Sequence, residues 1–149
     1  MGLLLGGKAF DDFRFLEGTL VMEAAYHFDG TLHPEYYTET ELAELSLAGE
    51  TRLPWRLMKE RIFGLIRGNH TPISFSFSLL LSPESTADLT ADPDVTGLVL
   101  NIRFREKSIF LTTGVSRTGF SIDRSADLAL EEFMRHFLKK SGIAFEKNV

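Results

Sequence analysis

Hydrophobic and polar residues alternate along several parts of the chain, which is the period of a β-strand with one buried face. The clearest example is residues 73–81, where apolar residues alternate with three serines. A similar alternation over residues 13–28 predicts a strand pair or one bulged strand. The dipeptide Asp29-Gly30 follows, and because this pair favours tight turns we expect a hairpin that returns through residues 31–32.

Two further alternating runs, residues 98–104 and 109–113, are separated by a short polar segment at 105–108. This spacing predicts an antiparallel hairpin. A short strand around residues 120–122 completes the expected sheet. Residues 83–94 carry no sustained periodicity, so a loop with one helical turn is expected there.

Helical spacing of apolar residues marks two longer segments. The first begins at Pro54 and runs to about Arg67, with Gly68 as its expected end. The second is capped by Asp123 or Ser125 and runs to residue 140.

A shorter helix is expected where Thr38 and Glu41 have the spacing of a capping box. The strands are grouped, and no regular strand–helix–strand alternation appears. We therefore expect one α+β domain over residues 1–149, with an antiparallel sheet of about five to six strands packed against two longer helices and a short one.

Composition narrows the classes of function. The chain has 149 residues, a formal net charge of -5 and no cysteine. An acidic chain has no general attraction for nucleic acid or anionic lipid, and the lack of cysteine excludes disulfides and thiolate metal sites. No apolar run approaches the roughly 20 residues of a membrane helix, and no basic leader precedes the first leucines. We expect a cytoplasmic protein without membrane contact.

The triplet Gly68-Asn69-His70 matches the core with which dinuclear metallophosphoesterases present an Asn and a His to their metals. Such a site also needs an Asp-x-His pair, which the chain lacks, and the triplet follows a helix here. A turn ended by Thr71-Pro72 explains the same residues.

Three other patterns suggest a metal, and each fails on its spacing. His27 and His33 lie on opposite faces of the expected hairpin, so they cannot bind one metal together. Residues Asp92 to Gly97 resemble the start of a calcium-binding loop, but Arg103 occupies the position at which such a loop needs a bidentate Glu. His136 lies on the last expected helix, where no second histidine lies one turn away to share a metal. We expect no metal and no cofactor.

The stretch "TTGVSRTGFS", residues 112–121, is the strongest candidate binding site. It is neither a phosphate-binding P-loop, because Phe120 replaces the lysine, nor a nucleophile elbow. Its amides and hydroxyls, with one arginine, could hold an anion through Ser116, Arg117 and Thr118. Arg67 and His70 are possible additions to this site, and a plain tight turn is the alternative.

Basic residues also gather on the helix from residue 54 to 67, which could contact phosphates. The preceding segment supplies five glutamates, so internal charge pairing or a solvated helix face is favoured over nucleic acid. The residues of this group are Arg52, Arg56, Lys59, Arg61 and Arg67.

Several motifs in the same order resemble a family of bacterial domains of unknown function, DUF5721. They are "AFDDF", "FDGTLHPEYY", "LPWRLMKERIFGLIRGNHTPISFSFSLLLSPE", "GLVLNIRF" and "LTTGVSRTGFSID". The resemblance covers about residues 9–138 and implies no activity, substrate or cofactor. Family members have a further helical stretch before the "LLL" segment, and they tend to carry Gly-Lys-x-Thr-Pro where this chain has Asn69.

The patterns favour a non-catalytic cytoplasmic domain that binds a protein or a small molecule. The first alternative is a binder or enzyme for a phosphorylated or carboxylated small molecule that uses the 112–121 loop. The second is nucleic-acid contact through the basic helix 54–67. The spacing of the carboxylates selects no catalytic residue, and a homodimer through the serine-faced strand or a sheet edge is compatible with the sequence.

Overall fold

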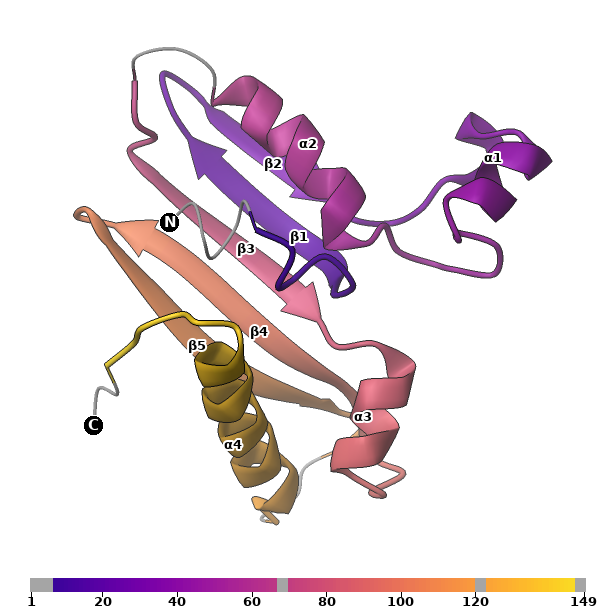
Figure 1. Ribbon diagram of the computed structural model, residues 1–149, viewed down its shortest axis with the longest axis vertical. Helices are drawn as coiled ribbons and strands as arrows, with labels where there is room; N and C mark the ends of the chain where they lie inside the picture. The colour runs from indigo at the N-terminus through magenta and orange to yellow at the C-terminus, as the bar shows by residue number, and fades with distance from the viewer. Residues whose placement is uncertain (1–6, 67–69, 120–122, 147–149) are drawn as a thin grey trace.

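A five-stranded antiparallel sheet forms the centre of the computed structural model, which describes residues 7–66, 70–119 and 123–146 (Figure 1). The strand order is β2-β1-β3-β4-β5. The strands are β1 (Arg14–Val21), β2 (Ala25–Asp29), β3 (Ser74–Leu80), β4 (Val95–Arg105) and β5 (Ser108–Arg117). The expected α+β class and antiparallel sheet are confirmed, whereas the expected strand at 120–122 lies outside the described residues.

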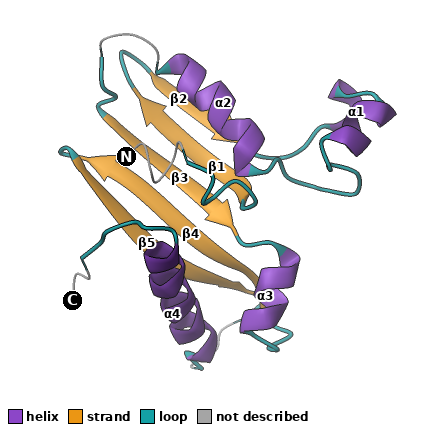
Figure 2. Cartoon of the chain, in the orientation of Figure 1, coloured by secondary structure: helices purple, strands orange, loops and turns teal. Residues whose placement is uncertain are grey.

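The helices, coloured purple in Figure 2, lie to one side of the sheet or at its ends. The longer ones are α2 (Trp55–Leu65) and α4 (Ser125–Lys140), and the shorter ones are α1 (Glu39–Glu44) and α3 (Pro83–Leu89). The capping box predicted at Thr38 and Glu41 is present, since Thr38 Oγ1 accepts from the Glu41 N–H while the Glu41 carboxylate accepts from the Thr38 N–H. The end expected at Gly68 lies outside the described residues, and helix α2 itself stops at Leu65.

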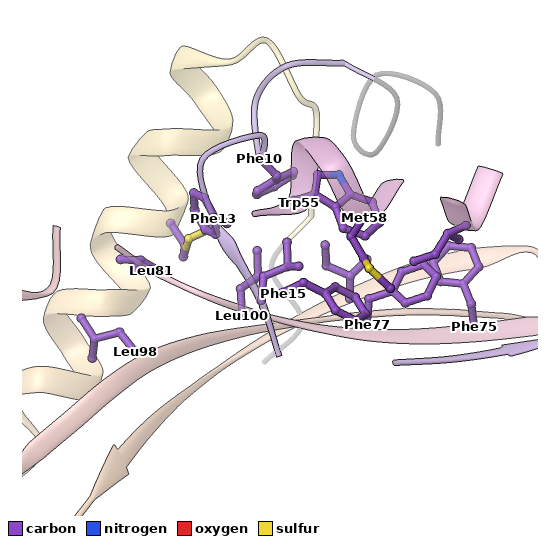
Figure 3. Close-up of a cluster of buried hydrophobic side chains, with 14 of the residues drawn as sticks. Phe10, Phe13, Phe15, Trp55, Met58, Phe75, Phe77, Leu81, Leu98 and Leu100 are labelled. Carbon is purple, nitrogen blue, oxygen red and sulfur yellow. The ribbon is translucent and has the colours of Figure 1, made fainter. Parts of the chain in front are cut away.

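One face of the sheet carries the core (Figure 3). Side chains of β3 alternate, so that Phe75, Phe77 and Leu79 are buried while the serines between them stay half-buried on the other face. Helix α2 covers the buried face with Trp55, and α4 does so with Leu130, both in the same apolar cluster. Neither α1 nor α3 contains a buried residue.

The hairpin expected at Asp29-Gly30 is wrong. Strand β2 instead pairs back onto β1 through a turn at residues 22–24, with Leu20 opposite Tyr26. Gly30 then runs against β1: its N–H donates to the Leu16 carbonyl. A Cβ at this position would lie 1.9 Å from the Phe15 carbonyl oxygen, so the glycine is there because the two backbones touch.

Residues 31–52 leave the body of the domain as an arm that carries α1 (Figure 1). Its base is closed by an antiparallel bridge between Thr31 and Arg52 and by a hydrogen bond from the Leu32 N–H to the Thr51 carbonyl. Leu47, in the far part of the arm, is also buried.

Three further expectations change in detail. Strand β5 extends to Arg117, so residues 112–117 of the expected loop are strand. Ile73 continues the alternation of β3 but precedes the strand at the end of the sheet, where it is 69% exposed and outside the core. The segment expected to be a loop with one helical turn forms α3, capped by the Ser82 side chain.

Candidate functional site

Arg117, at the end of β5, is engaged within the chain. Its Nη2 lies 2.8 Å from Asp127 on α4 and donates to the Asp123 carbonyl, and its Nη1 lies 3.5 Å from Asp92. The side chain is only 12% exposed. The guanidinium therefore joins β5, α4 and the segment before β4.

The two neighbours of Arg117 are also paired internally. Ser116 Oγ accepts from Thr96 Oγ1 at 2.9 Å, and the Thr118 N–H donates to the Asp94 carbonyl. An incoming anion would have to compete with two carboxylates for the same guanidinium. Anion binding at these three residues stays a prediction, and these contacts do not favour it.

The structure does not bring His70 to this place. His70 is exposed and precedes β3, at the end of the sheet where Ser74 pairs with Val21. Arg117 pairs with Val95 at the opposite end. The length of β3 separates the two by roughly 20 Å at about 3.3 Å per residue. Arg67, the other predicted addition, lies outside the described residues.

The basic side chains near α2 are largely held by the chain itself. Lys59 lies 2.5 Å from Asp11, and Arg56 lies 3.5 Å from Asp12 while donating to the Leu45 carbonyl. Arg61 reaches the Tyr36 hydroxyl. The sequence suggested pairing with the glutamates of residues 35–50, whereas Lys59 and Arg56 pair with Asp11 and Asp12. Nucleic-acid contact through this helix stays a prediction.

A groove lies on the serine-bearing side of the sheet, where the arm and α3 approach the ends of β1 and β3. Its volume is about 380 Å³, within the roughly 300–1,000 Å³ of small-molecule sites. A second hollow of about 340 Å³ adjoins it, and Arg14 and Glu50 line both. The polar side chains of the larger groove include Arg52, Thr86, Thr90, Asp92 and Thr96.

Arg14 and Glu50 form the common wall of the two hollows. Arg14 Nε and Nη2 donate to the two carboxylate oxygens of Glu50 at 3.0 and 2.9 Å, the two-pronged geometry that makes such a pair strong. The side chains are 17% and 30% exposed. Because Glu50 belongs to the arm and Arg14 to β1, this pair also fixes the arm against the sheet.

Arg52 differs from the other cations of the groove. Its Nη1 donates to the Leu16 carbonyl at 3.2 Å, and within the described part of the chain it makes no ion pair. It lies near enough to Asp29 to help lower the pKa of that carboxyl, although hydrogen bonds from Thr31 are the larger cause. Arg52 is half-buried and can turn its remaining N–H groups toward a ligand.

The titratable groups mark no catalytic pair. The pKa of Glu23 is lowered, first because the Tyr26 hydroxyl donates to it at 2.6 Å, but both residues stand at the β1–β2 turn away from the groove. In the described ranges no cluster of His, Asp and Glu could hold a metal ion, and no helix is both long and apolar enough to cross a membrane.

Comparison with known families matches residues 3–146 to a model described as "Family of unknown function (DUF5721)". The chain belongs to the DUF5721 family. No curated protein and no solved structure matches it. The resemblance read from the motifs is thereby confirmed. The region matched to DUF5721 includes the whole sheet and every residue of the groove, so the groove is part of the family domain.

The groove of this DUF5721 chain was missed by sequence reasoning. Arg14 and Glu50 are 36 positions apart, and neither stands in a motif. The available signal was the arginine at residue 52, which was assigned to a basic helix because it precedes that helix in the sequence. The structure places Arg52 at the base of the arm, where it lines the groove.

Proposed function

We propose that this chain is a non-catalytic cytoplasmic binding domain with the groove between the arm and α3 as its ligand site. The observation that carries the proposal is a groove of about 380 Å³ bordered by a cation, Arg52, that has no carboxylate within ion-pair distance in the described residues. Its other charged side chains are Arg14, Glu50 and Asp92, and each of them is paired.

The ligand class follows from the groups at the surface of the groove. Arg52 offers guanidinium N–H groups that match a carboxylate or a phosphate, and Thr90 and Thr96 add hydroxyls. Leu80, Leu81 and Pro83 supply apolar surface for the rest of the molecule. A small carboxylated or phosphorylated molecule therefore fits the groove better than the loop around Arg117, whose cation is already neutralised.

Binding is favoured over catalysis by the chemistry of the lining. The described residues of both hollows include no histidine, cysteine, lysine or tyrosine, and the hydroxyls of Thr86 and Thr96 bond to neighbouring oxygens rather than to a base. A nucleophile needs such a base within reach.

The test is an NMR titration of the chain with inorganic phosphate and a panel of small carboxylates and phosphate esters. We expect amide shifts at Thr51, Arg52, Thr90 and Thr96, and we expect Arg52→Ala to abolish them. Arg61→Ala, which removes an exposed arginine outside the groove, is the matched control and should leave them unchanged. Shifts confined to residues 116–118, or turnover of a panel member, would overturn the proposal.

A further inference from the structure

Strand β5 is a long sheet edge without the usual protection. It pairs with β4 on one side, and no described residue bonds to the backbone on its other side. From Ser108 to Ser116 it contains no charged residue and no proline. Native proteins usually block such an edge with lysine, proline or a covering segment, because open N–H and C=O groups recruit another strand.

The opposite edge of the sheet does not share this character. Strand β2 is only five residues long, and it carries exposed His27 and Asp29. A short, polar edge gives an incoming strand few hydrogen bonds. The open edge is therefore a specific feature of β5.

The register of the β4–β5 hairpin determines which backbone groups of β5 point outward. Glu106 and Lys107 form a two-residue turn with φ of 51° and 64°, and Arg105 pairs with Ser108. Pairs with mutual hydrogen bonds alternate along an antiparallel ladder from the turn. Between Ser108 and Ser116, the N–H and C=O groups that point away from β4 accordingly belong to Ile109, Leu111, Thr113 and Val115.

We propose that two copies of this chain associate by antiparallel pairing of their β5 strands, with the two-fold axis at Thr112. This goes beyond ligand binding in the groove, which lies at the other side of β4. In this register Ile109 faces the partner's Val115, and Leu111 faces the partner's Thr113. Every outward backbone group from Ile109 to Val115 then finds a partner.

Side chains on the serine-bearing face fit the same register. Phe110 lies opposite the partner's Gly114, where a Cβ would meet nothing within 4 Å, so the ring has open backbone to cover. An aromatic residue across from a strand glycine shields it and supports the pairing. Ser108 lies opposite the partner's Ser116, and the paired stretch from Ser108 to Ser116 contains no charged residue. The association is self-complementary, as a two-fold contact must be.

Helix α4 packs on the core face of β5, seen in Figure 1, and a two-fold axis perpendicular to the sheet keeps both copies of α4 on that face. The result is one continuous sheet across the two chains, with the grooves facing the same side.

The oligomeric state tests the proposal, measured by sedimentation velocity and light scattering over a wide dilution series. We expect a dimer at high concentration. Thr113→Pro removes an outward N–H without touching the β4–β5 ladder, and edge strands accept proline at such a position. Because both chains of the dimer carry the substitution, two intermolecular hydrogen bonds are lost, and the dissociation constant should rise roughly tenfold or more. His27→Lys on the β2 edge is the matched control and should leave the dimer intact.

A charge swap separates the register from a general loss of folding. Thr112→Lys and Thr112→Glu should each be monomeric, because like charges would meet at the axis, and mixing them should restore a dimer. The chain has no cysteine, so Thr112→Cys should form a disulfide-linked dimer under mild oxidation while Ser108→Cys should not. A monomer at every concentration, or a dimer unaffected by both Thr113→Pro and Thr112→Lys, would refute the pairing.

Discussion

Arg117 on β5 and Asp127 on α4 meet at 2.8 Å and connect the last strand to the last helix. The arginine simultaneously reaches Asp92 before β4, so one guanidinium holds three segments whose sequence positions differ widely. A loop sequence rich in Gly, Ser and Thr with one arginine suggests an anion site. The carboxylates that engage this arginine come from elsewhere in the chain, and an anion would have to compete with them for its guanidinium.

We predict that Arg117→Ala lowers the free energy of unfolding by about 1–3 kcal/mol, the usual range for a partly buried, charged hydrogen bond. Urea denaturation of Arg117→Ala, Asp127→Ala and the double variant gives the coupling energy between the two residues. The exposed pair Arg135 and Glu132 is the control, with an expected coupling below about 0.5 kcal/mol. Equal coupling in the two pairs would contradict a structural role for Arg117.

Gly30 and Gly64 should respond in opposite ways to substitution by alanine, because Gly30 is in close contact with backbone whereas Gly64 has open space beside it. Gly30→Ala would place a methyl group 1.9 Å from the Phe15 carbonyl oxygen, and we expect a loss of at least about 3 kcal/mol, the upper end of common overpacking costs. Gly64 lies in α2 with nothing within 4 Å of a Cβ, so Gly64→Ala should stabilise the protein by about 0.5–1 kcal/mol. Thermal unfolding measures both, and a tolerated Gly30→Ala would show that β1 does not constrain this glycine.

Most elements could be predicted because their signals are local. The alternation of β3, the stripe of α2 and the capping box of α1 depend on neighbours a few residues apart, and all of them are present. Asp29-Gly30 fails for the opposite reason. The local pattern indicates a turn, but the glycine is required by contact with Phe15, which no short-range pattern encodes.

The binding surface could not be predicted for a similar reason. Arg14, Glu50 and Arg52 meet only because residues 31–52 leave the sheet and return beside β1. The extent of β5 was underestimated because Gly114 and Ser116 have low strand preference when taken alone. The long ladder with β4 overrides that preference.

Acid should loosen the start of α4 through Asp123. Its carboxylate accepts from the Ser125 hydroxyl and N–H at 2.6 and 2.9 Å, and these bonds hold its pKa below the usual 3.8. A lowered folded pKa means that the stabilisation is present above pH 3.8 and is lost as the pH falls through the folded value. An NMR titration of Asp123 should give this lowered pKa, and Ser125→Ala should raise it. A pKa at or above 3.8 in the unmodified chain would contradict the bonds.

The arm should open when the pair between Arg14 and Glu50 is weakened. Glu50→Gln removes the charge of a two-pronged pair that is less than one-third exposed, and we expect the Leu32 amide at the base of the arm to exchange about five- to thirtyfold faster, equivalent to about 1–2 kcal/mol. The amide of Leu100 in β4 should not change, since the central ladder does not depend on the arm.

Glu44→Gln is the matched control, because Glu44 lies in the exposed helix of the same arm and makes no ion pair in the described residues. If Glu44→Gln accelerates exchange as much as Glu50→Gln, then general charge and not the specific pair holds the arm. If only Glu50→Gln accelerates exchange, the pair of Arg14 and Glu50 that lines both hollows also holds the arm closed.

The same variant should also change anion binding. Because Glu50→Gln would release Arg14 beside Arg52, it should bind anions in the groove more tightly than the unmodified chain.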